Sequence, residues 1–158
     1  MTALSLHWCL KVIIGLGLIG HFITLTLNPD LLPALFQLPY PGFLVLVLGG
    51  GGMVLWHHRI LRRAWRRAGE RFILVRRGGL FGRVRHPMYL GDAILYAGLA
   101  SYPATPISLA GLAVGWWALS RQASREDREL ATTFGDDHRR WRQATGLLLP
   151  RVSSPRSR

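Results

Sequence analysis

Arg85-His86-Pro87-Met88-Tyr89-Leu90-Gly91 is the stretch in which an arginine-rich part of the chain gives way to a hydrophobic one. Proline has no backbone N–H to lose and a fixed φ, so Pro87 is well suited to the first turn of a helix. His86 then stands immediately before that helix, and Tyr89 lies on its first turn. A histidine in this position is often only a boundary residue, so its interpretation depends on a second stretch near Glu126.

The charge balance narrows the class of protein. The 158 residues suit one domain (residues 1–158), and the 49% that are apolar lie in long blocks. The chain has 19 arginines, one lysine and eight acidic residues, a formal net charge of +12. Such a basic chain binds nucleic acid or spans a membrane with basic cytoplasmic loops. The single cysteine, Cys9, excludes an internal disulfide and a cysteine-based metal site.

The N-terminal part (residues 1–56) contains two apolar blocks that are expected to cross a membrane. Residues 4–27 hold one charge, Lys11, and exceed the about 20 residues that a helical span needs. A cleaved signal peptide fits less well, because no basic region precedes the block and no small-residue cleavage site follows it. We expect Lys11 to extend toward the nearer membrane surface. Residues 28–41 contain four prolines and are predicted as a loop, and residues 42–56 form the second span.

Two glycine motifs in these blocks are interpreted as helix-packing faces. Residues 15–20 match the dinucleotide-binding pattern GxGxxG, which requires a strand before it and an acidic residue about 20 positions later. Here the glycines lie inside a continuous apolar helix, where small residues let helices approach closely. The run of glycines at 49–52 is interpreted in the same way, because no Lys-Ser or Lys-Thr pair follows it.

Residues 88–120 are predicted to form a tight helical hairpin. Residues 88–102 are apolar except for Asp92, and residues 107–119 are apolar throughout. The turn contains Pro103 and Pro106. Each arm is shorter than a standard span, so the hairpin is either a full crossing or partly re-entrant.

The distribution of arginine predicts the orientation in the membrane. All 19 arginines lie in a basic cytosolic loop (residues 57–87) or after residue 120, and none lies in the other two loops. Four crossings with both termini in the cytosol place every arginine-rich segment on the cytosolic side, as the positive-inside rule requires. The predicted fold class is therefore an all-α integral membrane protein, expected in the inner (cytoplasmic) membrane of a bacterium. Contact with anionic lipid headgroups then explains the basic excess, and nucleic-acid binding is not needed.

The C-terminal region is predicted to form cytosolic helices (residues 121–151) followed by a disordered tail (residues 152–158). The segment from Arg125 reads as a helix that stops near Gly135, with Asp136 as the cap of a short following helix. Asp127 shares one face of the first helix with apolar residues three and seven positions later. By itself, this pattern suits a solvated helix resting on the membrane surface.

Together, the two stretches resemble the isoprenylcysteine carboxyl methyltransferases and the related phospholipid methyltransferases. The stretch from Arg85 to Gly91 matches the family pattern Arg-His-Pro-x-Tyr-x-Gly in full. After a helical hairpin, the family carries a Glu-Glu pair, a Leu, a Phe-Gly, two spaced tyrosines and a Leu-Pro. This chain has Glu126-Asp127, Leu130, Phe134-Gly135, His138, Trp141 and Leu149-Pro150 there. Asp127 thus replaces the second Glu, and His138 and Trp141 replace the two tyrosines. The resemblance covers residues 75–151, beginning near Gly79-Leu80-Phe81.

The resemblance implies a membrane-embedded enzyme that transfers the methyl group of S-adenosylmethionine to a lipophilic acceptor. It implies catalytic roles for Glu126 and for Arg85, which would pair with a carboxylate of the cofactor or acceptor. Carboxylates suit the ribose hydroxyls and the amino group of the cofactor, and Gly91 would let the cofactor lie close to its helix. The residues expected to bind the cofactor are His86, Tyr89, Gly91, Glu126, Asp127 and His138.

Gln122 departs from the family pattern. Carboxyl-methylating relatives tend to have an arginine at this position, four residues before Glu126. The glutamine argues against methylation of a prenylcysteine carboxylate more than against methyl transfer. A thiol, an amine or a lipid headgroup therefore also remains open as the acceptor.

Three other possibilities compete with the enzyme. A non-catalytic membrane protein of the same fold, binding a lipid or a protein partner, remains the alternative. A metal site is not predicted, because the adjacent His57 and His58 do not face one ligand and no His pair at i,i+4 is present. A nucleic-acid binder would interleave its arginines with more aromatic residues.

Overall fold

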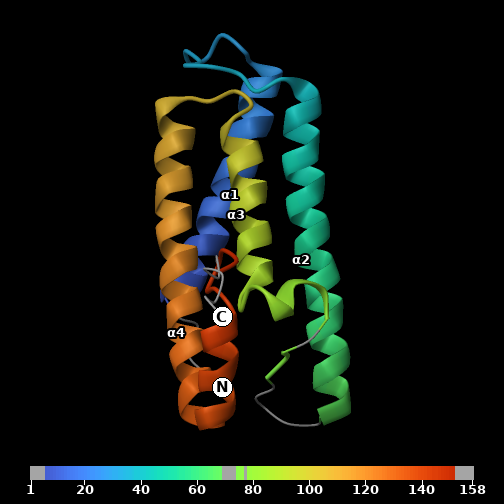
Figure 1. The fold of residues 1–158 in the computed structure, drawn as a ribbon. Helices are drawn as coiled ribbons and strands as arrows, with labels where there is room; N and C mark the ends of the chain where they lie inside the picture. The colour runs from blue at the N-terminus through green and yellow to red at the C-terminus, as the bar shows by residue number, and fades with distance from the viewer. Residues whose placement is uncertain (1–5, 69–73, 77, 152–158) are drawn as a thin grey trace, which may run out of the picture.

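The computed structural model describes residues 6–68, 74–76 and 78–151, and the described chain is helical with no strand. Its elements are α1 (Leu6–Leu27), α2 (Tyr40–Ala68), the short 3₁₀ helix η1 (Gly79–Gly82), α3 (Pro87–Ala100) and α4 (Pro106–Ala144). The four α-helices run alternately up and down (Figure 1). The all-α class is confirmed.

Two helices, α1 and α2, are long and apolar enough to cross a membrane. They have 22 and 29 residues, and only 11% of the apolar window of each helix is buried inside the protein. Large side chains such as Leu16, Val45 and Leu48 are exposed. A soluble protein rarely exposes apolar patches of this kind, because the hydrophobic effect favours their burial. The outer face of these helices therefore suits an apolar surrounding.

The starts of α3 and α4 follow local sequence rules. Pro87 occupies the first turn of α3 and His86 is the residue before it, as predicted. α4 begins with a capping box, in which the Thr105 side chain accepts a hydrogen bond from the Ser108 N–H. In return, the Ser108 hydroxyl accepts from the Thr105 N–H at 2.9 Å. These bonds satisfy N–H groups that have no partner within the helix.

Glycine permits a close contact between α2 and α3. A Cβ added at Gly50 would lie 2.6 Å from the Leu95 nitrogen, and one at Gly91 would lie 2.8 Å from Val54 Cγ2. Gly49, Gly51 and Gly52 face open space, so one position of this run makes the contact. In the first motif, Gly15 packs on Tyr96, while Gly17 and Gly20 also face open space.

The expected boundaries need two corrections on the basic side. α2 continues through residues 57–68, which were assigned to the loop, because arginine, leucine and alanine favour helix and no glycine or proline interrupts them. α4 likewise continues from the second arm of the hairpin into the first predicted C-terminal helix, and a kink at Gly135 separates that helix from the short helix that follows. Its one non-helical residue is Gly135, with φ 48°, at the predicted helix stop.

Lys11 also differs from expectation, because its side chain turns into the bundle rather than toward a membrane surface. Lys11 Nζ lies 3.2 Å from Asp92 Oδ2 of α3, and both side chains are mostly buried. It also lies 4.6 Å from the centre of the Tyr89 ring. A charge in an apolar surrounding is costly without a partner, so the carboxylate of Asp92 outweighs extension to the surface.

Candidate functional site

The segment before α3 is fixed by the C-terminal segment, residues 145–150. The Arg85 N–H donates to the Gly146 carbonyl at 2.8 Å, and the His86 N–H donates to the Leu147 carbonyl at 3.1 Å. The Gly146 N–H donates back to the Arg83 carbonyl at 3.0 Å. These bonds hold the backbone of Arg85 and His86 in place beside α4.

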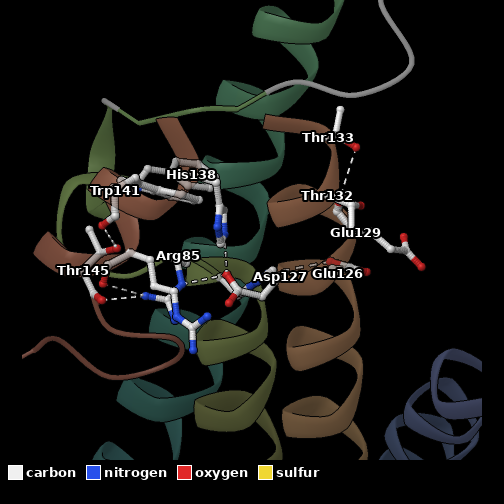
Figure 2. A network of polar contacts seen from close by, with 12 residues as sticks. Arg85, Glu126, Asp127, Glu129, Thr132, Thr133, His138, Trp141 and Thr145 are labelled. Atoms are coloured by element: carbon white, nitrogen blue, oxygen red, sulfur yellow. Dashed lines mark hydrogen bonds and ion pairs between the residues drawn. The ribbon is translucent and has the colours of Figure 1, made fainter. Parts of the chain in front are cut away.

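Behind this segment lies a buried ion network formed by Arg85, Asp127 and His138 (Figure 2). Asp127 Oδ1 accepts from Arg85 Nε at 2.8 Å and lies 3.0 Å from His138 Nε2. Arg85 Nη1 also donates to the Thr145 carbonyl at 2.6 Å. Burial lowers the pKa of Arg85, and the charge of Asp127 partly opposes that shift. The network therefore ties α3, α4 and the C-terminal segment together.

A second set of contacts fixes η1 between α2 and α4. His57 is fully buried, its Nδ1 lies 2.8 Å from the Met53 carbonyl, and its Nε2 accepts from the Leu80 N–H. Gly79 has φ +54°, and a Cβ there would lie 2.6 Å from His57 Nε2. From the other side, Trp141 Nε1 donates to the Phe81 carbonyl at 3.0 Å. No local pattern in the sequence predicts this role of His57.

The two sequence motifs meet at Tyr89 and Glu126. The Tyr89 hydroxyl donates to Glu126 Oε1 at 2.5 Å, and Gln122 Nε2 donates to the same oxygen at 2.8 Å. Glu126 Oε2 lies 3.7 Å from His86 Nδ1. The rings of His86 and Tyr89 are stacked with their centres 5.7 Å apart. We refer to His86, Tyr89 and Glu126 as the cavity cluster.

The cavity cluster lines a cavity of about 340 Å³ on the basic side of the bundle. This volume lies within the range of small-molecule sites, roughly 300–1,000 Å³. The apolar side of the cavity is formed by η1, by α4 and by the last turns of α2, beyond residue 57. The lining residues are Leu61, Trp65, Val75, Phe81, Arg85, His86, Pro87, Met88, Tyr89, Glu126, Glu129, Leu130 and Trp141.

His86 has an unsatisfied ring nitrogen. Its side chain is 8% exposed, and Nε2 is the one buried side-chain nitrogen or oxygen of the described residues without a hydrogen-bond partner. Burial lowers the pKa of His86, with the charges of Glu126 and Asp127 partly opposing the shift. His86 is therefore neutral at pH 7, and one ring nitrogen is an acceptor. Buried polar atoms are rarely left unpaired in native proteins, so the atom points to a ligand.

The charge of the cavity wall is opposite to that of the whole chain. Glu126 and Glu129 line the cavity, although the chain has 20 basic and eight acidic residues. Among the described lining residues, the one basic side chain is Arg85, which is paired with Asp127. Glu129 pairs with Arg125 at the surface, whereas the only ion-pair contact of Glu126 among the described residues is the neutral His86. The wall is therefore locally acidic.

The predicted site residues separate into three groups. His86, Tyr89 and Glu126 meet at the cavity, and Arg85 borders it. Asp127 and His138 do not line the cavity, because they are used in the buried ion network. Gly91 is on the opposite side of α3, packed on α2, so it is not positioned to lie against a ligand in this cavity.

Sequence reasoning missed the aromatic and apolar side of the cavity. Leu61 and Trp65 lie one helical turn apart on the part of α2 that was predicted as a loop. The apolar pair at i,i+4 within an arginine-rich segment was the available signal. Glu129 was missed because only the acidic pair before it matches the family pattern.

Comparisons with protein-family models, with curated proteins and with solved structures find no match. The described residues contain no group of three or more His, Cys, Asp or Glu side chains that could hold a metal ion. The geometry of the cavity therefore carries the functional argument.

Proposed function

We propose that this chain is an integral-membrane methyltransferase that uses S-adenosylmethionine to methylate a lipophilic acceptor. The supporting observation is the meeting of two sequence-distant motifs at one cavity, where Tyr89 and Glu126 are joined by a hydrogen bond of 2.5 Å. This contact brings together two of the residues that the resemblance to the isoprenylcysteine carboxyl methyltransferases assigns to the cofactor.

The cavity residues fit S-adenosylmethionine. Glu126 offers a carboxylate for the hydroxyl and amino groups of the ligand, and the unpaired nitrogen of the buried His86 can accept one further hydrogen bond. Aromatic side chains supply flat surfaces for an adenine ring. When bound, the cofactor supplies an electrophilic methyl group on a positively charged sulfur.

The protein's own task is then alignment and exclusion of water. Two hydrogen bonds to Oε1, from Tyr89 and Gln122, fix the orientation of the Glu126 carboxylate before a ligand arrives. Preorganised contacts of this kind lower the entropic cost of bringing reactants into line. Arg85 Nε and Nη1 are used for Asp127 and Thr145, so we assign Arg85 a positioning role in place of a catalytic one.

The membrane topology that we propose has four crossings, with both termini and the cavity on the cytosolic side of a bacterial inner membrane. The position of the hairpin turn supports a full crossing. The Leu35 N–H donates to the Ala104 carbonyl at 2.8 Å, and the Leu38 N–H donates to the Ser101 carbonyl at 2.9 Å. The turn between α3 and α4 therefore lies with the loop between α1 and α2 at one end of the bundle (Figure 1).

Titration calorimetry of the detergent-purified protein with S-adenosylmethionine tests the proposal. We expect Glu126→Gln and His86→Ala each to weaken binding about tenfold or more, a loss of about 1.4 kcal/mol or greater. Asp136→Asn is the matched control, because this carboxylate lies at the surface in an exposed pair with Arg139. Absence of binding to folded, unaltered protein would overturn the methyltransferase proposal and favour a non-catalytic membrane protein.

A further inference from the structure

We infer that the cavity selects a ligand with a positively charged sulfur or nitrogen over the same ligand without the charge. If the proposed function holds, the protein binds S-adenosylmethionine more tightly than S-adenosylhomocysteine, the product of methyl transfer, whose sulfur is uncharged. The two ligands share the nucleoside and amino-acid parts, so those contacts cancel in the comparison. Only the contacts around the sulfur distinguish them.

The first basis is the uncompensated carboxylate of Glu126. Its Oε1 accepts from two neutral donors, Tyr89 and Gln122, and its Oε2 faces His86, which is uncharged at neutral pH. No arginine or lysine of the described residues lies within ion-pair distance of Glu126. The hydrogen bonds of Glu126 thus come from neutral groups, and no cationic side chain of the described residues forms an ion pair with it. The Glu126 side chain is 37% exposed and lies beside apolar lining residues, where its charge attracts a cation more strongly than it would in bulk water.

The second basis is the aromatic lining. Trp65, Phe81 and Trp141 border the cavity from α2, η1 and α4. Aromatic faces attract ammonium and sulfonium groups through the ring quadrupole, and tryptophan is the most effective of them. Trp65 is half exposed, whereas Phe81 and Trp141 are buried and held by the contacts of η1. Carboxylate and aromatic groups on one cavity form the kind of cage that recognises such cations.

The location of the negative charge is informative because the rest of the chain is so basic. The net charge of +12 repels a cationic ligand at long range, so a local carboxylate is needed to reverse the potential inside the cavity. Methyl transfer removes the ligand's positive charge. The acceptor's lone pair forms the new bond to carbon while the S–CH₃ electron pair stays on sulfur, leaving a neutral thioether. The acidic cavity then holds the product less strongly than the substrate, which favours its release.

Calorimetry of the full chain in detergent with three ligands tests this inference. The probes are S-adenosylmethionine, S-adenosylhomocysteine and sinefungin, in which an amine-bearing carbon replaces the sulfonium. We expect the affinity of each cationic ligand to exceed that of S-adenosylhomocysteine by a factor of about ten or more.

Two variants separate the contributions. Glu126→Gln should bring the affinity ratio of S-adenosylmethionine to S-adenosylhomocysteine close to one, and Trp65→Leu should reduce it by a smaller factor. Trp116→Leu is the control, because Trp116 is exposed on α4 away from the cavity. If a variant does not fold, the three-ligand comparison on the unaltered protein decides.

The outcomes distinguish this inference from the function on which it rests. Binding of S-adenosylhomocysteine as tightly as S-adenosylmethionine, or more tightly, overturns charge selection and leaves the methyltransferase proposal standing. Failure of all three ligands to bind overturns both.

Discussion

The cavity cluster and the buried ion network share two pairs of neighbouring residues. Arg85 and His86 are one pair, Glu126 and Asp127 are the other, and in each pair one residue belongs to the network and the other to the cavity cluster. On α4, successive residues point about 100° apart, which sends Glu126 to the cavity and Asp127 into the interior. The acidic pair therefore combines a group available to a ligand with a group that stabilises the fold.

The largest expected effect concerns the network. In Asp127→Asn, Arg85 would lose its charged partner while both side chains stay buried. Breaking a buried ion pair in this way costs about 3–5 kcal/mol. Thermal unfolding of the detergent-solubilised protein should show a large drop in melting temperature, and Glu126→Gln a small one. Equal effects of the two variants would contradict the division between network and cavity.

The next prediction concerns the helix contact at Gly91. A methyl group in Gly91→Ala would lie 2.8 Å from Val54 Cγ2 and 2.9 Å from the Gly50 carbonyl oxygen. Overpacking of this kind lowers stability by about 1–3 kcal/mol, measurable by the same unfolding experiment. The control Gly49→Ala faces open space and should not destabilise the protein. If Gly91→Ala instead kept full stability and weakened binding of S-adenosylmethionine, Gly91 would belong to the cavity.

The smallest expected effect is the pH dependence due to His86. Burial lowers its pKa below the ordinary value of 6.5 in the folded protein. The unfolded chain therefore takes up a proton near pH 6.5 that folded His86 takes up only at lower pH. This contribution to stability is complete above about pH 6.5 and is lost as the pH falls through the folded pKa.

Melting temperatures of the unaltered protein and His86→Gln check this dependence. The variant has no titrating group at this position. The difference in melting temperature between the unaltered protein and the variant should therefore become smaller as the pH falls from about 7.5 to about 5. His86→Asn should give the same trend. A gap that widens on acidification would show that the protonated form of His86 is the one that the fold favours.

Local signals predicted the element starts and stops well. Pro87 begins α3, and Gly135 interrupts α4, because both residues restrict or permit specific backbone angles. The continuation of α2 to Ala68 was missed, because an arginine-rich segment was interpreted as a loop although its residues favour helix.

The assignment of site residues was limited by a different factor. The sequence places Glu126 and Asp127 on one helix, but it does not say which element covers each face. Arg85 reaches Asp127 only because the segment at residues 145–150 holds the backbone before α3. Gly91 lies against α2 for a similar reason, since the contact at Gly50 depends on how two distant helices meet. Such long-range packing has no local signature.

The contacts of residues 145–150 have a consequence for the order of assembly during synthesis. The ribosome makes these residues after all four helices, yet they hold Arg85 and His86 through the bonds of Gly146 and Leu147. The four helices can therefore form and pair before the cavity is complete. The backbone of Arg85 and His86 is fixed only after this last part of the described chain has emerged.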